Sequence, residues 1–361
     1  MKDLDIAVVG GGIIGCLTAR EAVRRAPGAS VAVLEGDAVG SGASRRSAGL
    51  HFPRGASERV RRMSAYSERF YGGLRAAEPG LPVHPVGLSV LAKESAGAEI
   101  QELYLEGARP RRTDAPPAPL TVLPDGHAAW TCDGAQYAYV GALAQELARG
   151  LRPAVSFREG NGVTSLEPKG DGYLLGLGTG ERLYAGSVVI APGPWLAAPA
   201  WRSYVAPLGA RVKKVVALHV EQAPAPGDGV VVFHEEDAFL LPLHERGHWL
   251  FSYTCQEWDV DPDRLSGALT AGELAEARAA LASWAPGMAE RAVGGRVFCD
   301  AYSENREPLV RALDPDGGLV FAGAANGSGY RLGPAIAAEA VDLLSAARGV
   351  FRAQGDQGDH A

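Results

Sequence analysis

The sequence has few cysteines, no excess of positive charge and no long apolar segment. Its four cysteines are scattered, with no Cys-x-x-Cys pair and no Cys/His cluster, which argues against a metal site or a disulfide framework and favours the reducing cytoplasm. A net charge of −7 leaves no electrostatic footprint for nucleic acid or an anionic membrane. No run approaches the roughly 20 apolar residues of a membrane span. The apolar N-terminal stretch follows two acidic residues and leads into glycines, so we interpret it as a strand and not a signal peptide.

What the sequence does contain is ample apolar material for a folded core. Of its 361 residues 47% are hydrophobic and only 21% are charged, which is enough for one or two sizeable cores. The length favours two domains, and a single intertwined pair of lobes is equally compatible.

The first chemically informative segment is DIAVVGGGIIG at residues 5–15. Residues 6–9 form a continuous apolar run typical of a central parallel strand. The pattern of residues 13–25 predicts a helix that a Pro-Gly pair ends, and residues 30–34 predict a second strand. The segment therefore predicts a βαβ unit whose first turn is rich in glycine.

Three glycines of this turn have the spacing of a dinucleotide-binding site. Gly10 permits the turn, Gly12 lets a pyrophosphate approach the backbone, and Gly15 lets the helix pack closely on the sheet. The helix N-terminus supplies unpaired N–H groups and a positive dipole end. Glu35 would accept hydrogen bonds from the ribose hydroxyls, and it disfavours the 2′-phosphate of NADP. The alternative is an ordinary tight turn. The predicted contacts are Gly10, Gly12, Ile13, Ile14, Gly15 and Glu35.

The loop GSGASRRSAGLHFP at residues 40–53 favours FAD over NAD. A nicotinamide enzyme normally continues from the second strand into a helix, whereas this loop can run beneath an extended dinucleotide and leave room for a flat ring system. The residues expected to donate to the pyrophosphate are Ser41, Ser44 and Arg45. The residues expected near the flavin ring are Ser47, Ala48 and Gly49.

Two later segments agree with this interpretation. SVVIAPGPW at residues 187–195 predicts a buried strand whose Pro/Gly turn, with Gly193 and Trp195, could close over the adenosine. Residues 318–334 predict a strand and a glycine turn, and the helical residues 335–347 follow, with a proline placed at the first turn of the helix.

With these motifs in this order, the sequence resembles the FAD-dependent D-amino-acid oxidase, glycine oxidase and sarcosine oxidase family over nearly its whole length. The motifs are the Gly/Glu fingerprint, GASRRSAG, VVIAPGPW and NGSGYRLGPAIAAEAVDLL. The resemblance implies an α/β fold, in which a Rossmann-like FAD-binding lobe is interleaved with a smaller α+β substrate lobe built on a mixed sheet. The expected bounds are residues 1–80, 138–205 and 300–361 for the FAD-binding lobe, and residues 81–137 and 206–299 for the substrate lobe.

The resemblance also implies an anchor for a substrate carboxylate. Arg331 falls where sarcosine oxidases place a lysine for this purpose, and a planar guanidinium can bind a carboxylate bidentately. The alternative is a surface arginine. Arg54, Arg306 and Arg45 are weaker candidates.

Further residues fall near functional positions of the family. Tyr302 and Tyr253 are expected to line the substrate pocket, although buried core tyrosines fit equally. His51 could face the ring or hydrogen-bond a backbone carbonyl, and Val163 could contact adenine through its backbone or be an edge-strand valine. Glycines in the last turn would let the backbone approach the ring, and the following helix N-terminus would stabilise a reduced flavin anion. The residues expected there are Gly327, Gly329, Tyr330, Arg331 and Leu332.

One departure from the family pattern concerns the link to the flavin. Flavin-linking cysteines in sarcosine oxidases stand two residues before the tyrosine, whereas Cys299 stands three residues before Tyr302. The sequence therefore predicts non-covalent FAD.

Two other departures concern the reaction. The lysine that promotes reaction with oxygen in sarcosine oxidases is replaced by the apolar segment around Trp249 and Leu250, with His244 or His248 as substitutes. Oxidase and dehydrogenase chemistry thus both stay open. Glycine oxidases also carry an arginine where this chain has Gly327, so glycine itself is not implied as the substrate.

The predicted reaction is FAD-dependent oxidation of the C–N bond of a small amino acid or N-substituted glycine. A hydride leaves the substrate's Cα–H, the resulting imine hydrolyses, and O2 is the acceptor that gives H2O2. An apolar region with Trp249, Phe239 and Phe251 favours an alkyl substituent on the amine. One alternative is an FAD dehydrogenase of an amino or hydroxy acid that passes electrons to a quinone or carrier. The other is a non-catalytic dinucleotide-binding protein.

Overall fold

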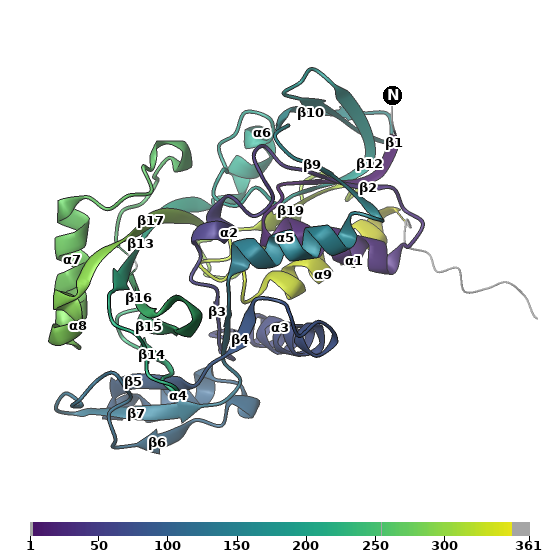
Figure 1. Cartoon of the computed structure of the whole chain (residues 1–361). Coiled ribbons are helices and arrows are strands. Elements are labelled where there is room, and N and C mark those ends of the chain that lie inside the picture. Colours follow the sequence, from purple (N-terminus) through teal and green to yellow (C-terminus); the bar gives the residue numbers. More distant parts are fainter. Residues whose placement is uncertain (1–2, 254, 349–361) are drawn as a thin grey trace, which may run out of the picture.

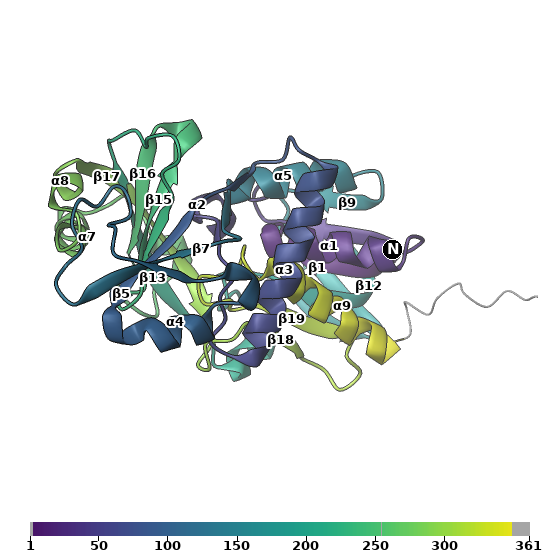
Figure 2. The same cartoon turned by 90° about the horizontal axis from the view of Figure 1, so that it is seen from below.

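Residues 3–253 and 255–348 are described by a computed structural model, in which two large sheets lie side by side with a small third sheet between them (Figure 1). Each large sheet has eight strands. The turned view separates the two lobes that form around these sheets (Figure 2).

The first sheet has a parallel centre, as the continuous apolar run at residues 6–9 predicts. Its order is β10-β11-β12-β1-β2-β9, with β19 beside β12 and β18 beside β19. β1 pairs in parallel with β2 and β12, whereas β10, β11 and β18 form antiparallel pairs. The strands are β1 (Asp3–Val9), β2 (Val31–Leu34), β9 (Val155–Arg158), β10 (Val163–Lys169), β11 (Gly172–Leu177), β12 (Arg182–Ile190), β18 (Leu309–Ala312) and β19 (Leu319–Gly323).

Helices from both ends of the chain cover one face of this sheet. Ile6 and Val8 of β1 pack toward α1 and α9, whose side chains complete one core cluster. α1 also packs against α5, and α3 against α9. The helices are α1 (Ile13–Arg25), α3 (Glu58–Ala77), α5 (Val140–Leu151) and α9 (Gly333–Arg348). The predicted helices at residues 13–25 and 335–347 are thereby confirmed.

The second sheet is mixed. Its order is β17-β13-β16-β15-β14-β5-β7-β6, in which β14 and β5 are parallel and the other pairs are antiparallel. The strands are β5 (Leu88–Lys93), β6 (Arg111–Thr113), β7 (His127–Cys132), β13 (Arg211–Val220), β14 (Val230–Phe233), β15 (Ala238–Leu243), β16 (His248–Tyr253) and β17 (Ala292–Tyr302).

Two helices cover the face of the second sheet that points away from the first lobe. These are α7 (Ala271–Ala282) and α8 (Pro286–Glu290), and both views place them on the outer side (Figures 1 and 2). α7 begins with a capping box, since Thr270 and Glu273 bond each other's backbone N–H. α4 (Gly97–Leu103) packs through Ile100 on the other core of this lobe.

Short elements connect the two lobes. The third sheet has the order β3-β8-β4, formed by β3 (Leu50–His51), β8 (Gln136–Ala138) and β4 (Val83–Pro85). The segment expected as a plain loop at residues 40–53 contains α2 (Ala43–Arg46) as well as β3, and α6 (Arg202–Val205) follows the 187–195 segment. The residue bounds predicted for the two lobes stay a prediction, and residues 349–361 of the last range lie outside the described part. No helix within residues 3–253 and 255–348 is long and apolar enough to cross a membrane.

Candidate cofactor and substrate site

A cavity of about 570 Å³ opens beside the glycine turn and reaches from the first sheet to β17 of the second. One group of lining residues directly follows β2 or lies at the start of β10: Glu35, Asp37, Gly162 and Val163. Another group comes from β17 and the turn before α9, including Phe298, Asp300, Gly327 and Tyr330. The cavity thus joins segments that are far apart in the sequence.

The glycine turn forms a cradle for a phosphate group. A Cβ on Gly15 would stand 1.9 Å from the Gly10 carbonyl oxygen, so this glycine lets α1 pack on β1. Gly12 faces the cavity, where a Cβ would meet only Ser44 Oγ at 3.2 Å. Gly12 is also the N-cap of α1 and has no side chain of its own to cap this helix end. The positive end of the helix dipole therefore faces open space that a Cβ and any larger side chain would fill.

Two polar side chains fix the geometry around this cradle. The Glu35 carboxylate accepts hydrogen bonds from the backbone N–H groups of Gly11 at 2.7 Å and Asp37 at 2.9 Å, which holds it at the cavity wall. Ser44 Oγ accepts from the Ile13 N–H at 3.0 Å and so ties α2 to the start of α1.

Most of the sequence-predicted cofactor contacts line this one cavity. They come from the glycine turn, the 40–53 segment, the start of β10, the Pro/Gly turn after β12 and the turn before α9. They are Gly10, Gly12, Ile13, Ile14, Glu35, Ser41, Ser44, Ser47, Val163, Gly193, Trp195, Gly327, Gly329 and Tyr330.

Other predicted contacts lie elsewhere. Arg45 and Ala48 line a second cavity on the other side of α2, and the side chain that reaches the first cavity is Arg46. Gly49 has φ +68° and packs where a Cβ would stand 2.0 Å from the Ala138 carbonyl oxygen, so its role is a close backbone approach. Leu332 is buried in the core of the first lobe.

The cavity also contains residues that sequence reasoning missed. Gly36 and Asp37 directly follow Glu35, and this adjacency was an available signal. Asp300 stands two residues before Tyr302 on one strand, so period-two alternation places both on one face. Trp201, Asp263 and Cys299 carried no local signal, because tertiary packing brings them to the cavity. Asp263 accepts a hydrogen bond from Trp195 Nε1 at 2.7 Å, which joins the two lobes.

Arg331 lies just beyond the turn at residues 327–330 and is held without an acidic partner. Its guanidinium donates to the Arg54 carbonyl and, at 3.0 Å, to Ser328 Oγ, and it lies 5.1 Å from the centre of the Phe52 ring. Burial and the nearby Arg54 lower the pKa of Arg331 to about 10. Within the described residues no carboxylate forms an ion pair with it, so this half-buried cation is suited to an anionic ligand.

Tyr302 and Lys213 lie close to the same turn. A Cβ on Gly327 would stand 3.4 Å from the Tyr302 hydroxyl, and Tyr302 also bridges Ala325 through its backbone. The buried Lys213 Nζ lies 5.7 Å from the Tyr302 ring centre and 4.9 Å from that of Trp258. Burial lowers the pKa of Lys213, whereas the charge of Asp237 raises the pKa of Lys213, Tyr302 and Arg331 alike. The charge of Asp237 therefore acts on all three groups, although no ion pair joins it to Lys213 or Arg331 among the described residues.

The structure does not bring Tyr253 to this place. Its hydroxyl donates to Glu276 of α7 at 2.8 Å, on the outer face of the second sheet. Trp249 and Phe251 share that face and are buried against α7 and α8, so the expectation that they accommodate a substrate's alkyl group is wrong. The physical reason is alternation: residues 249, 251 and 253 share one face of β16, and that face is the outer one.

His51 lies behind Arg331 and does not line the cavity. It is fully buried, and its Nδ1 lies 3.4 Å from the Arg331 carbonyl oxygen. Of the two predictions for His51, this agrees with a hydrogen bond to a backbone carbonyl and not with a position facing the ring. Burial and the Arg331 charge lower the pKa of His51 to about 3, so its imidazole is neutral at physiological pH.

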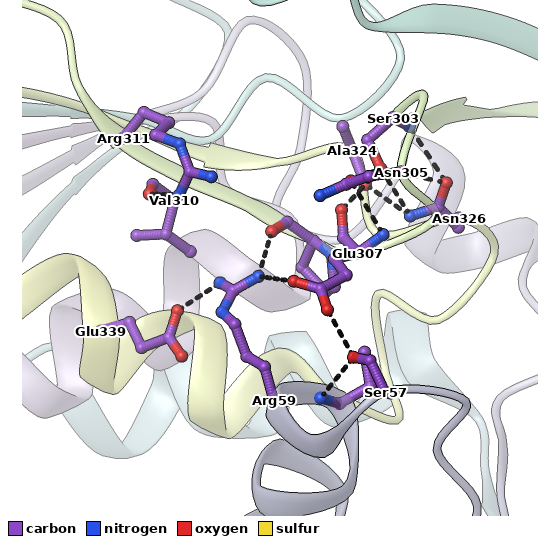
Figure 3. Close-up of polar contacts among 12 residues, drawn as sticks. Ser57, Arg59, Ser303, Asn305, Glu307, Val310, Arg311, Ala324, Asn326 and Glu339 are labelled. Carbon is purple, nitrogen blue, oxygen red and sulfur yellow. Dashed lines mark hydrogen bonds and ion pairs between the residues drawn. The ribbon is translucent and has the colours of Figure 1, made fainter. Parts of the chain in front are cut away.

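A polar network supports the turn that precedes α9, at residues 324–330 (Figure 3). Asn326, in the left-handed conformation at φ +54°, accepts from the Ser303 N–H at 3.0 Å and donates to Ser303 Oγ at 3.1 Å. Ser303 Oγ donates to the Glu307 carbonyl at 2.6 Å, and Arg59 joins the Glu307 and Glu339 carboxylates at 3.2 and 2.5 Å. α3, α9 and the turn before α9 are thus held together next to the cavity.

The chain belongs to the family of FAD dependent oxidoreductases, DAO, whose model matches residues 5–343. The protein is therefore an FAD-dependent oxidoreductase, and the resemblance, the fold class and FAD as the cofactor are confirmed. Among residues 3–253 and 255–348, no group of three His, Cys, Asp or Glu side chains could hold a metal ion. No curated protein sequence matches the chain.

Solved structures share this fold at low sequence identity. Glycine oxidase from Geobacillus kaustophilus superimposes with a TM-score of 0.79 at 22% identity, over 96% of this chain and 95% of that one. A variant of NikD, an unusual amino acid oxidase essential for nikkomycin biosynthesis, has a TM-score of 0.79 at 18% identity over 100% and 96%. Fructosyl amine:oxygen oxidoreductase (Amadoriase I) from Aspergillus fumigatus has a TM-score of 0.75 at 18% identity over 95% and 87%.

The residues present fit FAD. The cradle at Gly12 and the N-terminus of α1 suit the pyrophosphate, and the Glu35 carboxylate suits the ribose hydroxyls. The part of the cavity at Asp300, Gly327 and Tyr330 would hold the ring system. When bound, FAD supplies the acceptor for a hydride.

Proposed function

We propose that this protein oxidises the C–N bond of a small amino acid or N-substituted glycine to an imine that hydrolyses, with O2 as acceptor. The observation that carries the proposal is Arg331, a half-buried cation that no carboxylate pairs with among the described residues, next to the turn that lines the ring end of the cavity. The structural neighbours, named glycine oxidase, amino acid oxidase and fructosyl amine:oxygen oxidoreductase, support the same substrate class.

In this proposal Arg331 binds the substrate carboxylate and sets the orientation of Cα toward the ring. Two fixed hydrogen bonds and the Phe52 ring hold the guanidinium in place, so little freedom is lost on binding. Tyr302 supplies a hydroxyl beside the turn at Gly327. The cations Arg331 and Lys213 lower the pKa of a nearby amine, which favours the neutral amine that can lose a hydride from the adjacent carbon.

One observation favours the dehydrogenase alternative as a second candidate. The apolar segment around Trp249 and Leu250 replaces the lysine that sarcosine oxidases carry for reaction with oxygen, and both residues are fully buried in the cores of the second lobe. One ring nitrogen of His248 and one of His244 lie within hydrogen-bond distance of the backbone carbonyls of Arg246 and Asp228, so we propose neither histidine as a replacement.

Anaerobic mixing tests the substrate class. The visible flavin absorbance is followed with a panel of amino acids and N-alkylglycines, their amides, and the matching 2-hydroxy acids. Bleaching by the amines and not by their amides supports the proposal, whereas bleaching by the hydroxy acids alone contradicts it. Air is then admitted: stoichiometric H2O2 indicates an oxidase, and slow reoxidation that a quinone accelerates indicates the dehydrogenase.

We also propose that the protein works in the cytoplasm. The support is chemical: all four cysteines are buried free thiols, which a reducing compartment preserves. Finding the protein in an oxidising compartment of its cell by fractionation would contradict this.

A further inference from the structure

A second cavity, of about 260 Å³, lies on the other side of the 41–48 segment and contains three arginines. Arg45 comes from α2, Arg246 from the turn between β15 and β16, and Arg296 from β17. The first cavity does not include any of the three, and the walls that both cavities share are Ser41, Ser47 and Val140. The second cavity therefore has its own charged lining.

Arg296 is half-buried and forms the inner part of this lining. Its Nη2 donates to the Ser47 carbonyl at 3.3 Å, and its Nε is buried without a hydrogen-bond partner in the described structure. Burial and the nearby Arg246 lower the pKa of Arg296 to about 10, so it remains charged at neutral pH. A buried N–H donor of a cation without an acceptor is costly unless a ligand supplies that acceptor.

Arg246 and Arg45 are exposed and form the mouth of the cavity. The Arg246 guanidinium lies 4.0 Å from the centre of the Tyr139 ring, which fixes its position by a cation–π contact. Two exposed cations and one half-buried cation produce a positive potential that attracts anions into the cavity.

Acidic residues do not neutralise this cluster in the part of the chain that the structure describes. No ion pair links a carboxylate to Arg45, Arg246 or Arg296 there, and Glu245, next to Arg246 in sequence, pairs with His84 at 3.0 Å. Gln145 and the hydroxyls of Ser41 and Ser47 add neutral polar groups to the lining. The lining thus combines repelling cations with neutral hydrogen-bonding groups, the combination that a bound oxyanion stabilises.

We propose that this cavity is a binding site for a small dianionic oxyanion, such as phosphate or a short dicarboxylate. The anion bridges Arg45 of the first lobe to Arg246 and Arg296 of the second. It is separate from the carboxylate anchor at Arg331, which lines neither cavity. Occupation of the site links the two lobes behind the segment that carries the cofactor contacts Ser41, Ser44 and Ser47.

Calorimetric titration of the flavin-loaded protein with inorganic phosphate, at constant ionic strength kept with chloride, tests the proposal. Malonate is titrated in parallel to separate an inorganic anion from a dicarboxylate. We expect one saturable site per chain, and an affinity about tenfold weaker or less in Arg296→Met and in Arg246→Met, since each removes a charge-assisted contact. Arg149→Met is the matched control, because Arg149 is an exposed arginine of α5 that pairs with Glu146.

Flavin content per chain is measured for every variant. Absence of saturable binding of either anion, or binding that Arg246→Met and Arg296→Met leave unchanged, overturns the proposal. Loss of FAD in both variants also overturns it, because the cavity then belongs to the cofactor site. If Arg296→Met does not fold, Arg246→Met still tests the proposal, because Arg246 is exposed and its substitution leaves the core unchanged.

Discussion

Gly15 of α1 lies against the backbone of Gly10, with room for a hydrogen and for no carbon: a Cβ would stand 1.9 Å from the Gly10 carbonyl oxygen. Gly12, between them, meets only the Ser44 hydroxyl, at 3.2 Å, and otherwise faces the cavity. Two glycines of one motif therefore have separate purposes, one for packing and one for the ligand.

This difference predicts different defects in two variants. Gly15→Ala should be destabilised by about 3 kcal/mol or more, because the obstacle is backbone and cannot rotate away. Gly12→Val should fold with nearly the stability of the flavin-free wild type and yet bind FAD weakly, because its side chain occupies the phosphate cradle. Urea unfolding and titration of flavin-free protein with FAD measure the two effects. Normal FAD affinity in Gly12→Val would contradict our placement of the pyrophosphate.

Arg331→Met should retain the fold and the flavin while kcat/KM falls about a hundredfold, the effect of losing a desolvated charge-assisted contact. Arg331→Lys should recover part of the loss, because the charge returns without the planar fork. The amide of the same substrate should be poor with the wild type and almost indifferent to the substitution. If Arg331→Met turns over the acid normally, the anchor must be another cation, and Arg54 is then the next candidate.

Asp300 should make the flavin-free protein less stable as the pH rises. Burial raises the pKa of its carboxyl from 3.8 to about 6 in the folded chain. Below pH 4 the group is protonated in both states and costs nothing. Between pH 4 and 6 the unfolded chain ionises first, so stability falls, and above pH 6 the loss is constant at about 3 kcal/mol. Asp300→Asn should remove this loss, which urea unfolding at pH 4.5 and pH 8 can measure. Equal pH dependence in the two proteins would show that Asp300 titrates normally.

Tyr253→Phe should leave turnover within about twofold of the wild type and cost about 1 kcal/mol of stability, because it removes only the hydrogen bond to Glu276. Tyr302→Phe is the matched comparison, since its hydroxyl lies beside the turn at Gly327, and it should change kcat/KM by more. A large loss of turnover in Tyr253→Phe with unchanged stability would show that Tyr253 acts in catalysis, contrary to its place in the structure.

FAD should leave the protein when the protein is precipitated with acid. Cys299 lines the cavity, but burial and the neighbouring Asp300 raise the pKa of its thiol to about 12, so the reactive thiolate is scarce. The yellow colour is therefore expected in the supernatant. A flavin-bearing peptide that contains Cys299 would contradict non-covalent binding.

The parts of the site that could be predicted from the sequence depend on local geometry. Gly10, Gly12, Gly15 and Glu35 lie within one βαβ unit, where the turn and the strand length fix their relation. The capping box at Thr270 is local in the same sense, because both of its residues lie within one helical turn.

The parts that could not be predicted depend on which face a residue presents. Leu250 and Tyr253 lie on opposite faces of β16, and the alternation is visible in the sequence, but the sequence does not say which face meets the cofactor lobe. For the same reason the sequence predicted a cofactor contact at Arg45 of the short helix α2, whereas the arginine that lines the first cavity is Arg46. Asp263 and Trp201 reach the cavity only through contacts between distant segments.

The place of β19 beside β12 has a consequence for the order of synthesis. As the nascent chain leaves the ribosome, the phosphate cradle at Gly12 and the Glu35 carboxylate are complete once β12 has been made. The wall formed by Gly327 and Tyr330 comes from the last segment before α9. We therefore expect the flavin ring to bind only after nearly the whole chain has been translated, and a prematurely terminated product to lack the end of the cavity at which we place the ring.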